Sequence, residues 1–415
     1  MKTTSTRNWS LSIREKSKTS SLEKRIKRYV VGRTRTFFAP TSPGLEEVCV
    51  QELKSLPLPP EEITQIDGGI EFKGKLQHCY LANLHLRTAN RILMRLKEFR
   101  ASNFRQLSNK LEDLPWELFL LKDTFPRIDV SSKNSRLYHK AAIAERIHTN
   151  LEKHFDQIDP IETQNNSQQI PQHLFIRVID DRFMISIDSS GDLLYKRGIK
   201  RYGGKAPMRE TMAAAALMMA GYDSNEPLID PMCGTGTFSI EAAMIALNTA
   251  PGLKRDFAFM GWPSFKPAMW NNMKKEAEKL IKEASIPVIF ASDKDKKMSK
   301  TLQKNLEEGG LAEIVKVSTH GFEELSPNNL SADFPENKKG LIILNPPYGI
   351  RIGTKTKSRK LFDEIVTKLK KDFKGWKLAL FVPHRNITRR IPFKLNSRLL
   401  DHGGTKLVLL TGTID

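Results

Sequence analysis

The second half of this 415-residue chain predicts an α/β fold built on a doubly wound sheet. Three short apolar strands end, in chain order, at a glycine-bearing turn after residues 228–229, at Asp293 and at Asn345. Ligands bind such sheets at the carboxyl ends of the strands. We therefore expect the three strand ends to border one crevice.

The glycine turn spans residues 230–237, Asp-Pro-Met-Cys-Gly-Thr-Gly-Thr, and leads into a helical segment at 239–247. Gly234 and Gly236 allow the backbone to approach a ligand closely, because they carry no Cβ. The start of the helix offers free N–H groups to an anion such as a carboxylate. The spacing matches neither the G-x-G-x-x-G of dinucleotide-binding proteins nor a P-loop, and a Gly-x-Gly turn alone is weak evidence of function.

The second strand, 288–292, ends at Asp293. An acid at this place in a doubly wound sheet typically accepts hydrogen bonds from ribose hydroxyls. Taken alone, an aspartate after a strand is more often the N-cap of the next helix. Its place in the series of three strand ends is what favours the ligand-binding role.

The third strand, 341–344, runs into Asn345-Pro346-Pro347-Tyr348, the most informative stretch of the chain. Asn345 offers a carboxamide oxygen, and the prolines stiffen the turn while leaving their carbonyls as acceptors. Tyr348 offers a ring on which a base can stack. This set of groups can hold a flat ligand that carries an exocyclic amine, such as guanine or adenine. The plainer alternative is a strand that ends in a proline-rich turn.

These motifs carry a resemblance to a known family. From about residue 190 to 415 the chain resembles class I S-adenosylmethionine-dependent methyltransferases that methylate amines, with 230–237 as the cofactor loop and 345–348 as the catalytic motif. The resemblance is narrowed by the segments 195–201, 206–214, 251–253 and 259–262. These are similar to bacterial THUMP-domain RNA methyltransferases, in particular the group that makes N2-methylguanosine in large-subunit ribosomal RNA.

The resemblance implies a Rossmann-like class I methyltransferase fold with a C-terminal hairpin, preceded by an α+β ferredoxin-like and THUMP region. It implies methyl transfer from S-adenosylmethionine to an exocyclic base amine in RNA, with N2 of a guanosine in 23S rRNA as the expected target. The partner would be 23S rRNA or a ribosome assembly intermediate. Three alternatives stay open: adenine-N6 methylation of RNA or DNA, glutamine methylation of a release factor, and a non-catalytic RNA-binding or ribosome-assembly role.

The resemblance also assigns site residues. Asp230 would orient the glycine loop or the cofactor's amino group, and Asp293 would bind its ribose. The expected catalytic residues are Asn345, Pro346, Pro347 and Tyr348. The expected cofactor-binding residues are Asp230, Cys233, Gly234, Gly236, Thr237, Asp293, Pro207 and Thr211. The expected RNA-binding residues are Arg136, Tyr138, Lys196, Arg197, Lys200, Arg201 and Arg351.

Two positions depart from the family pattern. The family usually carries an acid after the third strand, where the adenine amine of the cofactor is bound, and here Gly321 stands in its place. The contact would then come from a backbone group or from Glu323. The residue after Asn-Pro-Pro-Tyr-Gly is often acidic in the family, and here it is Ile350.

The composition sets outer bounds. A chain of 415 residues suits two or three domains. No apolar run approaches the ~18–20 residues that span a membrane, and the N-terminus lacks the apolar core of a signal peptide. Cys49, Cys79 and Cys233 form no C-x-x-C pair, so we expect no disulfide framework, no metal site and a cytoplasmic location.

The net charge of +20 predicts a polyanionic partner. Residues 1–35 form a basic arm whose only acids are Glu15 and Glu23, and we expect this arm to be disordered when free. It would wrap RNA or serve as a solvated tail, with a targeting peptide as a further possibility. A second basic cluster, within 351–360, directly follows the catalytic motif.

The first half predicts smaller α+β units. We expect a ferredoxin-like piece at 36–75 and a THUMP RNA-binding domain at 76–190, followed by the methyltransferase domain at 191–415. Apolar spacing predicts a helix over 80–96 with Arg87 and Arg91 on its outer face. Further expected elements are a helix at 141–155, a hairpin at 174–188, a helix at 360–373, a strand at 376–382 and a strand-turn-strand unit at 398–410.

Overall fold

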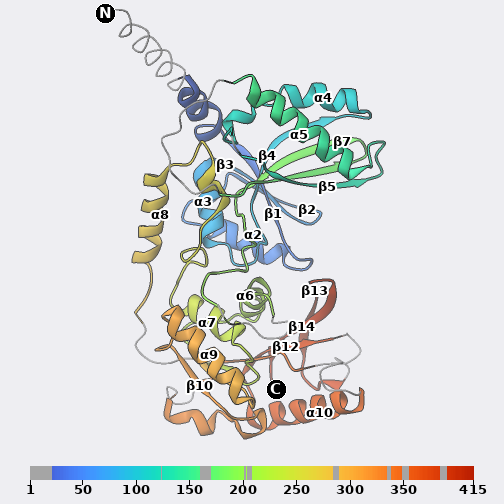
Figure 1. The fold of residues 1–415 in the computed structure, drawn as a ribbon. Coiled ribbons are helices and arrows are strands. Elements are labelled where there is room, and N and C mark those ends of the chain that lie inside the picture. Colours follow the sequence, from blue (N-terminus) through green and yellow to red (C-terminus); the bar gives the residue numbers. More distant parts are fainter. Residues whose placement is uncertain are drawn as a thin grey trace, which may run out of the picture.

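The computed structural model describes residues 21–122, 124–158, 170–200, 202, 208–283, 289–333, 338–347, 355–383 and 390–415. The chain builds two seven-stranded sheets, one from residues 35–188 and one from residues 228–413 (Figure 1). Helices pack on one face of the first sheet and on both faces of the second sheet.

The first sheet has the strand order β2-β3-β1-β4-β7-β6-β5. Its strands are β1 (Arg35–Pro40), β2 (Glu62–Ile66), β3 (Gly69–Gly74), β4 (Leu93–Arg100), β5 (Arg127–Lys133), β6 (His173–Ile179) and β7 (Arg182–Asp188). Neighbouring strands pair antiparallel except β5 and β6, which are parallel. The sheet is continuous across the expected boundary between residues 75 and 76.

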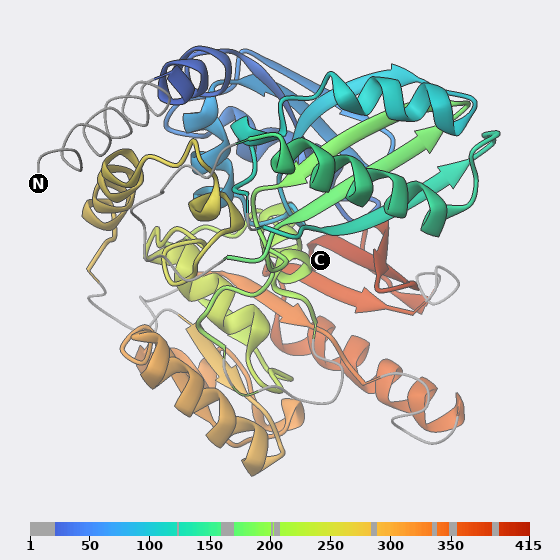
Figure 2. The same cartoon turned by 45° about the horizontal axis from the view of Figure 1, so that its top comes forward.

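One face of this sheet holds the core of the first half. Phe37, Met94, Ile187 and Leu174 are register partners on four adjacent strands, and all are fully buried. They pack against α2 (Glu46–Lys54), α3 (Leu76–His85), α4 (Phe104–Glu112) and α5 (Lys140–Asp156). Figure 2 shows α4 and α5 lying across this face. The opposite face is partly open to solvent, as the half-buried Phe175 shows.

The helix expected over residues 80–96 is wrong in its second half. Helix α3 ends at His85, because Leu86 adopts an extended conformation and β4 starts at Leu93. Apolar residues at 92–94 therefore serve the sheet, with side chains alternating between its faces, rather than a helical stripe. Arg87 lies in the connection and not on an outer helix face.

The basic arm is ordered from residue 21 onward. Residues 21–26 are helical and continue into a π-helical turn, Lys27–Val31. Ile26 and Val30 are buried in the core, with Leu22 packed against it, and the spacing of four places all three on one helix face. This apolar stripe replaces the disorder expected for residues 21–35, and residues 1–20 lie outside the described part of the chain.

The second sheet has the strand order β10-β9-β8-β11-β12-β14-β13. Its strands are β8 (Leu228–Asp230), β9 (Ile289–Ser292), β10 (Val315–Ser318), β11 (Leu341–Leu344), β12 (Lys377–Val382), β13 (Leu395–His402) and β14 (Thr405–Thr413). The first five are parallel, and β14 joins β12 antiparallel as part of the C-terminal hairpin. The predicted doubly wound sheet with a final hairpin is confirmed.

Helices cover both faces of this second sheet. Leu228, Ile289 and Leu341 belong to a core shared with α6 (Glu210–Met219), α7 (Thr237–Ala246) and α9 (Lys296–Gly309). The alternate residues Ile229 and Phe290 belong to a core shared with α10 (Lys355–Asp372). Burial on both faces explains why these strands read as continuous apolar runs in the sequence.

The segment after α7 returns to the first half of the molecule. It contains a short 3-10 helix, Ala258–Gly261, and α8 (Pro267–Lys279), whose aromatic residues join the N-terminal core. Tyr80 of α3 stacks on Phe259 at 4.4 Å between ring centroids and meets Trp270 edge-on. Gly252 donates its N–H to Leu84 O, and a Cβ there would lie 2.7 Å from a carbonyl oxygen. The two halves are thus packed through shared aromatic side chains.

Buried charges also join the two halves. Glu241 of α7 is fully buried and accepts a hydrogen bond from Arg197 Nε at 3.0 Å. Arg87, from the connection between α3 and β4, lies 3.6 Å from the other carboxylate oxygen and donates to Thr249 O. The helix that follows the glycine turn is therefore tied to the first sheet by an ion-pair network.

Two further findings concern the whole described chain. None of its helices combines the length and the apolar character that a membrane span requires. Within the same residues, no group of three or more His, Cys, Asp or Glu side chains is placed to hold a metal ion. Cys49, Cys79 and Cys233 are free and buried.

Candidate active site

The three strand ends predicted to share a crevice lie side by side. Leu341 and Ile342 of β11 pair with Leu228 and Ile229 of β8, so Asn345 follows the same sheet edge at which β8 ends. On the other side, Asp230 pairs with Ala291 of β9, two residues before Asp293. The strand order reverses between β8 and β11, which is where ligands bind in open α/β sheets.

The glycine turn combines a tight packing contact with open space. Gly234 and Gly236 have φ of 54° and 80°, in the left-handed region. A Cβ on Gly236 would lie 2.1 Å from Leu302 of α9, so helix packing requires this glycine. A Cβ on Gly234 would meet nothing within 4 Å, which leaves room for a ligand above the turn.

Asp230 carries a carboxylate oxygen without a partner among the residues that the structure describes. Its Oδ2 accepts from Ser239 Oγ at 2.7 Å, while its buried Oδ1 accepts no hydrogen bond from those residues. Burial raises the pKa of this carboxyl to about 7. Because unpaired buried oxygens are costly, a donor on a bound molecule would be the natural partner for Oδ1.

Asp293 braces the glycine turn and is not the helix cap. Its Oδ2 accepts from Gly234 N and its Oδ1 from Asp295 N, both at 2.9 Å. Asp295 caps α9 through its bond to Lys297 N. The N-cap role considered for Asp293 is therefore filled by Asp295, two residues later.

Two of the remaining expected cofactor residues, Cys233 and Thr237, belong to the same turn. Cys233 is buried, and burial raises the pKa of its thiol well above the ordinary value, so it is uncharged at neutral pH. Thr237 begins α7 and accepts a hydrogen bond from Lys200 Nζ at 2.6 Å. Thr211 is buried in the first turn of α6. Pro207 lies outside the described residues.

The motif after β11 is partly described. Asn345 and Pro347 are half-buried and Pro346 is buried at the end of the strand. The Asn345 carboxamide forms no hydrogen bond with the described residues. Tyr348, Ile350 and Arg351 lie outside the described residues.

Glu323 follows β10 and is one of the two groups that the sequence offered for the adenine contact. A Cβ on Gly321 would lie 2.2 Å from Glu323 Oε1 and 2.6 Å from its Oε2. An aspartate at position 321 would hold its own carboxylate oxygens about 2.4 Å from that Cβ. The Glu323 carboxylate thus occupies the volume of the missing acid. Gly321 N is meanwhile bonded to Glu324 Oε1 at 3.0 Å.

The residues expected to bind RNA fall into two groups. Arg136 and Tyr138, before α5, are strongly exposed, and Lys196 is exposed on the connecting segment beside Asp192. The other group is buried: Arg197 is 4% exposed and donates to Glu241, Leu194 O and Arg87 O. The prediction that Arg197 contacts RNA is therefore wrong, because its guanidinium is buried and donates its hydrogen bonds to groups inside the protein. Arg201 lies outside the described residues.

Lys200 also points inward. Its side chain is 9% exposed, lies 4.0 Å from Glu210 and donates to Thr237 at the start of α7. Burial lowers the pKa of this lysine, with Glu210 opposing that shift. Its place beside the glycine turn fits an anionic group of a cofactor better than RNA, which corrects the expectation for Lys200.

The fold and this crevice together define a class I methyltransferase. Counted from β8, the strand order is 3-2-1-4-5-7-6 with an antiparallel seventh strand. A family model described as "RMKL-like, methyltransferase domain" matches residues 197–399, and one described as "RlmL ferredoxin-like domain" matches residues 36–93.

Curated relatives give the same result. "Putative RNA methyltransferase YpsC" of Bacillus subtilis is 32% identical over 339 residues, which cover 80% of this chain and 83% of the relative. "Ribosomal RNA large subunit methyltransferase K/L" of Psychromonas ingrahamii is 32% identical over 83% of this chain and 46% of the relative. The chain therefore belongs to the RMKL-like methyltransferase family, and it spans about half the length of its K/L relatives.

A solved structure resembles the chain over nearly its full length. The crystal structure of SMU.472, a "putative methyltransferase complexed with SAH", is 29% identical and has a TM-score of 0.78. The alignment covers 92% of this chain and 99% of that one. The arrangement of both sheets is thus shared with a solved protein.

Proposed function

We propose that this protein methylates an exocyclic base amine in RNA with S-adenosylmethionine as donor, and that the target is N2 of a guanosine in 23S rRNA. The observation that carries the proposal is the juxtaposition of Asp230, Asp293 and Asn345 at the switch point of the second sheet. The names of the K/L relatives support ribosomal RNA as substrate, and the SAH complex of the SMU.472 structure supports the cofactor. Such a substrate places the reaction in the cytoplasm.

The crevice residues fit the cofactor from end to end. When bound, S-adenosylmethionine supplies an activated methyl group. The Oδ1 of Asp230, which has no partner among the described residues, accepts a hydrogen bond from the ammonium group of the cofactor. The open space above Gly234 lets the cofactor lie close to the backbone of the turn. Lys200 and the N-terminus of α7 face the carboxylate. Asp293 accepts from the ribose, and Glu323 takes the adenine amine in place of the acid missing at Gly321.

The acceptor side is the motif after β11. The Asn345 side-chain oxygen and the Pro346 carbonyl would accept hydrogen bonds from the two N–H groups of the base amine, which keeps its lone pair on nitrogen and aims it at the methyl group. The N–C bond would form as the S–C bond to that methyl group breaks. No strong base is needed, because the amine becomes far more acidic as the new bond forms and its proton can pass to water. Positioning of this kind is worth on the order of several kcal/mol. Tyr348 holds the flipped base by stacking.

The first half of the chain would position the RNA. We interpret its sheet as the ferredoxin-like piece, 36–75, joined to a THUMP domain, 76–190, with residues 191–415 as the methyltransferase domain. Arg136, Tyr138 and Lys196 are its exposed candidates for RNA contact. A ribosome assembly intermediate is the second form in which 23S rRNA would be presented.

Nucleoside mass spectrometry tests the proposal directly. Purified protein and labelled S-adenosylmethionine are incubated with ribosomal RNA from a strain that lacks this gene, with DNA of that strain as a parallel substrate. Labelled N2-methylguanosine in RNA supports the proposal. Labelled N6-methyladenosine keeps the mechanism and changes the base, whereas absence of label in both nucleic acids favours a protein substrate or a non-catalytic role.

A further inference from the structure

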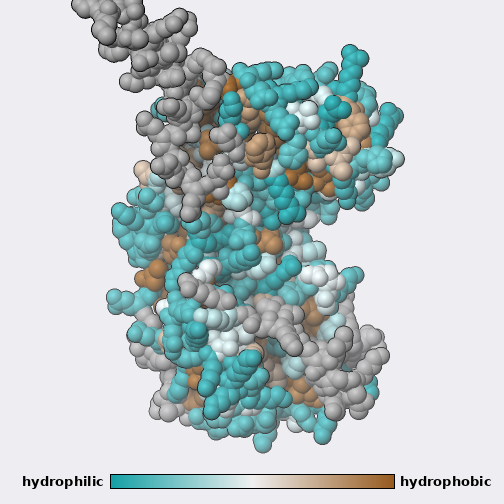
Figure 3. Space-filling model, viewed as in Figure 1, coloured by the Kyte–Doolittle hydropathy of each residue, from teal (hydrophilic) through white to brown (hydrophobic). Residues whose placement is uncertain are grey.

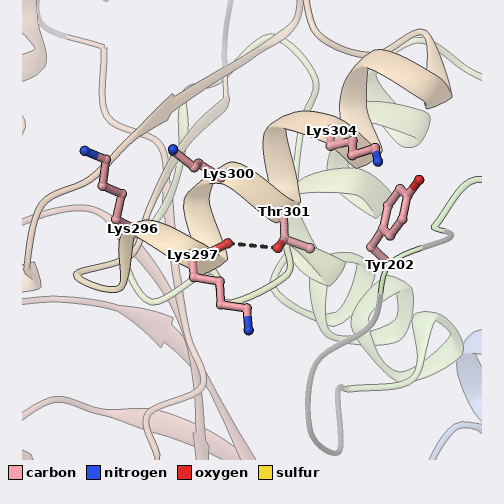
Figure 4. Close-up of a pocket in the computed structure, with 6 residues that line it drawn as sticks. All are labelled: Tyr202, Lys296, Lys297, Lys300, Thr301 and Lys304. Carbon is pink, nitrogen blue, oxygen red and sulfur yellow. Dashed lines mark hydrogen bonds between the residues drawn. The ribbon is translucent and has the colours of Figure 1, made fainter.

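Helix α9 presents a row of lysines to solvent. Lys296, Lys297, Lys300 and Lys304 line one shallow pocket of about 500 Å³ together with Tyr202 and Thr301. Figure 4 shows Lys296 and Lys300 projecting to one side of the helix, Lys297 to the other side in this view, and Lys304 beside the Tyr202 ring. The surface over α9 is mostly hydrophilic in the space-filling view (Figure 3). We call these four lysines the α9 lysine face.

The helix holds this face rigidly. Lys296, Lys300 and Lys304 recur every four residues and so share one side of α9. The opposite side is buried through Ser299, Leu302, Asn305 and Leu306. Leu302 packs against Gly236 of the cofactor loop so closely that a Cβ would not fit there. The lysine positions are therefore fixed relative to the crevice.

Tyr202 is fixed beside the lysines. Its N–H donates to Asn305 Oδ1 and its carbonyl accepts from Asn305 Nδ2, both at 3.1 Å. Its hydroxyl donates to Glu308, and the Lys304 ammonium lies 4.0 Å from the ring centroid. The side chain remains 37% exposed, so its ring is held in place yet accessible.

Three of the four lysines form no ion pair with the residues that the structure describes, and Lys304 contacts the Tyr202 ring. Among the ion pairs of the described residues, none involves Lys296, Lys297 or Lys300, whereas Lys196 and Lys377 pair with acids. A row of like charges without acidic partners creates a positive potential along the helix. Such a potential attracts anionic ligands and does not stabilise the fold. The row starts next to Asp295, the cap of α9, and extends about 12 Å along the helix axis.

We propose that the α9 lysine face binds the phosphodiester backbone of the RNA substrate, with Tyr202 stacking on an unpaired base. The inference rests on the proposed function and extends it, because α9 begins three residues after Asp293 at the crevice edge. A basic row beside a fixed aromatic ring is the combination that binds single-stranded nucleic acid. RNA that reaches the crevice would run along α9, and the face would bind it without reading its sequence.

A salt series separates this face from general surface charge. The triple variant Lys296→Ala, Lys297→Ala, Lys300→Ala is compared with Lys370→Ala, Lys371→Ala, Lys374→Ala, which removes three exposed lysines at the end of α10. Filter binding to in vitro transcribed 23S rRNA is measured at several salt concentrations. For the α9 triple we expect roughly tenfold weaker binding and a log K against log salt slope shallower by about 2. The α10 triple should change affinity less than about twofold.

Three further measurements keep the test decisive. The triple replacement by arginine should restore binding, and Tyr202→Phe should bind RNA better than Tyr202→Ala. SAH affinity by calorimetry should be unchanged in every variant, and the KM for RNA should rise with little change in kcat. Equal salt slopes for the two alanine triples, or a loss of SAH binding in the α9 triple, would overturn the inference. If the wild type neither binds nor methylates RNA, the proposed function fails first.

Discussion

The basic residues of the domain junction and those of α9 contribute to the same net charge of +20 but do opposite things. Arg197 is buried and Arg87 largely so, and both lie against Glu241, where they hold the two halves together. The α9 lysines are exposed, and within the described residues only Lys304 has a partner, the Tyr202 ring. Arginine suits the first role because its fork makes several hydrogen bonds when desolvated, whereas lysine keeps its charge in water. A charge count therefore predicts a polyanionic partner without locating the surface that meets it.

Breaking the junction should have the largest effect. Arg197→Met leaves Glu241 with one partner in a buried site, and we expect a loss of about 3–5 kcal/mol in the free energy of unfolding. Urea denaturation measures it, with the neighbouring exposed Lys196→Met as control, for which we expect less than about 1 kcal/mol. Equal losses for the two variants would remove the distinction between buried and exposed basic residues.

Asn345→Ala isolates the chemistry from both basic regions. Removal of one positioned hydrogen-bonding group should lower kcat by roughly 10²–10³-fold, by analogy with oxyanion-hole variants. Stability, SAH affinity and the salt dependence of RNA binding should match the wild type, because Asn345 belongs to neither region. Near-normal turnover would mean that the motif after β11 does not accept the amine protons.

The pH dependence of stability should reveal the buried acid of the crevice. The pKa of Asp230 is about 7 in the folded protein, above the 3.8 of an unperturbed carboxyl, so the folded state binds the proton more tightly. The contribution of this group to stability is then greatest below pH ~4, falls as the pH rises and levels off above pH ~7. Between pH 5 and 7 we expect a loss of about 2 kcal/mol without cofactor.

Asp230→Asn should remove this pH dependence. Urea denaturation of the two proteins at pH 5 and pH 7 measures the difference. Unchanged slopes in both proteins would show that another group, or no group, titrates in this range.

Glu323 gives the smallest but most specific effect. Glu323→Ala should weaken SAH binding by roughly tenfold, because one hydrogen bond to a charged acceptor is lost. The double variant Gly321→Asp, Glu323→Ala should recover most of the affinity, since it restores the acid at the usual family position. Calorimetry with SAH and with its 6-oxo analogue, which lacks the amine, checks the partner: the analogue should not distinguish wild type from Glu323→Ala. Failure of the double variant to recover would assign the contact elsewhere.

Local sequence and the family resemblance together predicted the architecture of the second half. Apolar strands that end at 230, 293 and 345 predicted a doubly wound sheet with one crevice, and the strand-turn-strand unit at 398–410 matched the final hairpin that the resemblance implies. Parallel strands that are buried on both faces can be recognised in a sequence as continuous apolar runs. Their carboxyl ends lie at the same edge of the sheet. For the same reason, the expected positions of Asp230, Asp293 and Asn345 agree with the structure.

Only the tertiary structure determined the contacts between segments that lie far apart in the chain. Residues 21–31 form helical turns because their apolar side chains pack into a core built by later segments, and β4 replaced the end of a helix because a sheet edge was available to pair with it. The burial of Arg197 depends on Glu241, and the role of Glu323 depends on where its carboxylate folds relative to Gly321. Such outcomes follow from packing and desolvation across the whole molecule, which no local pattern encodes.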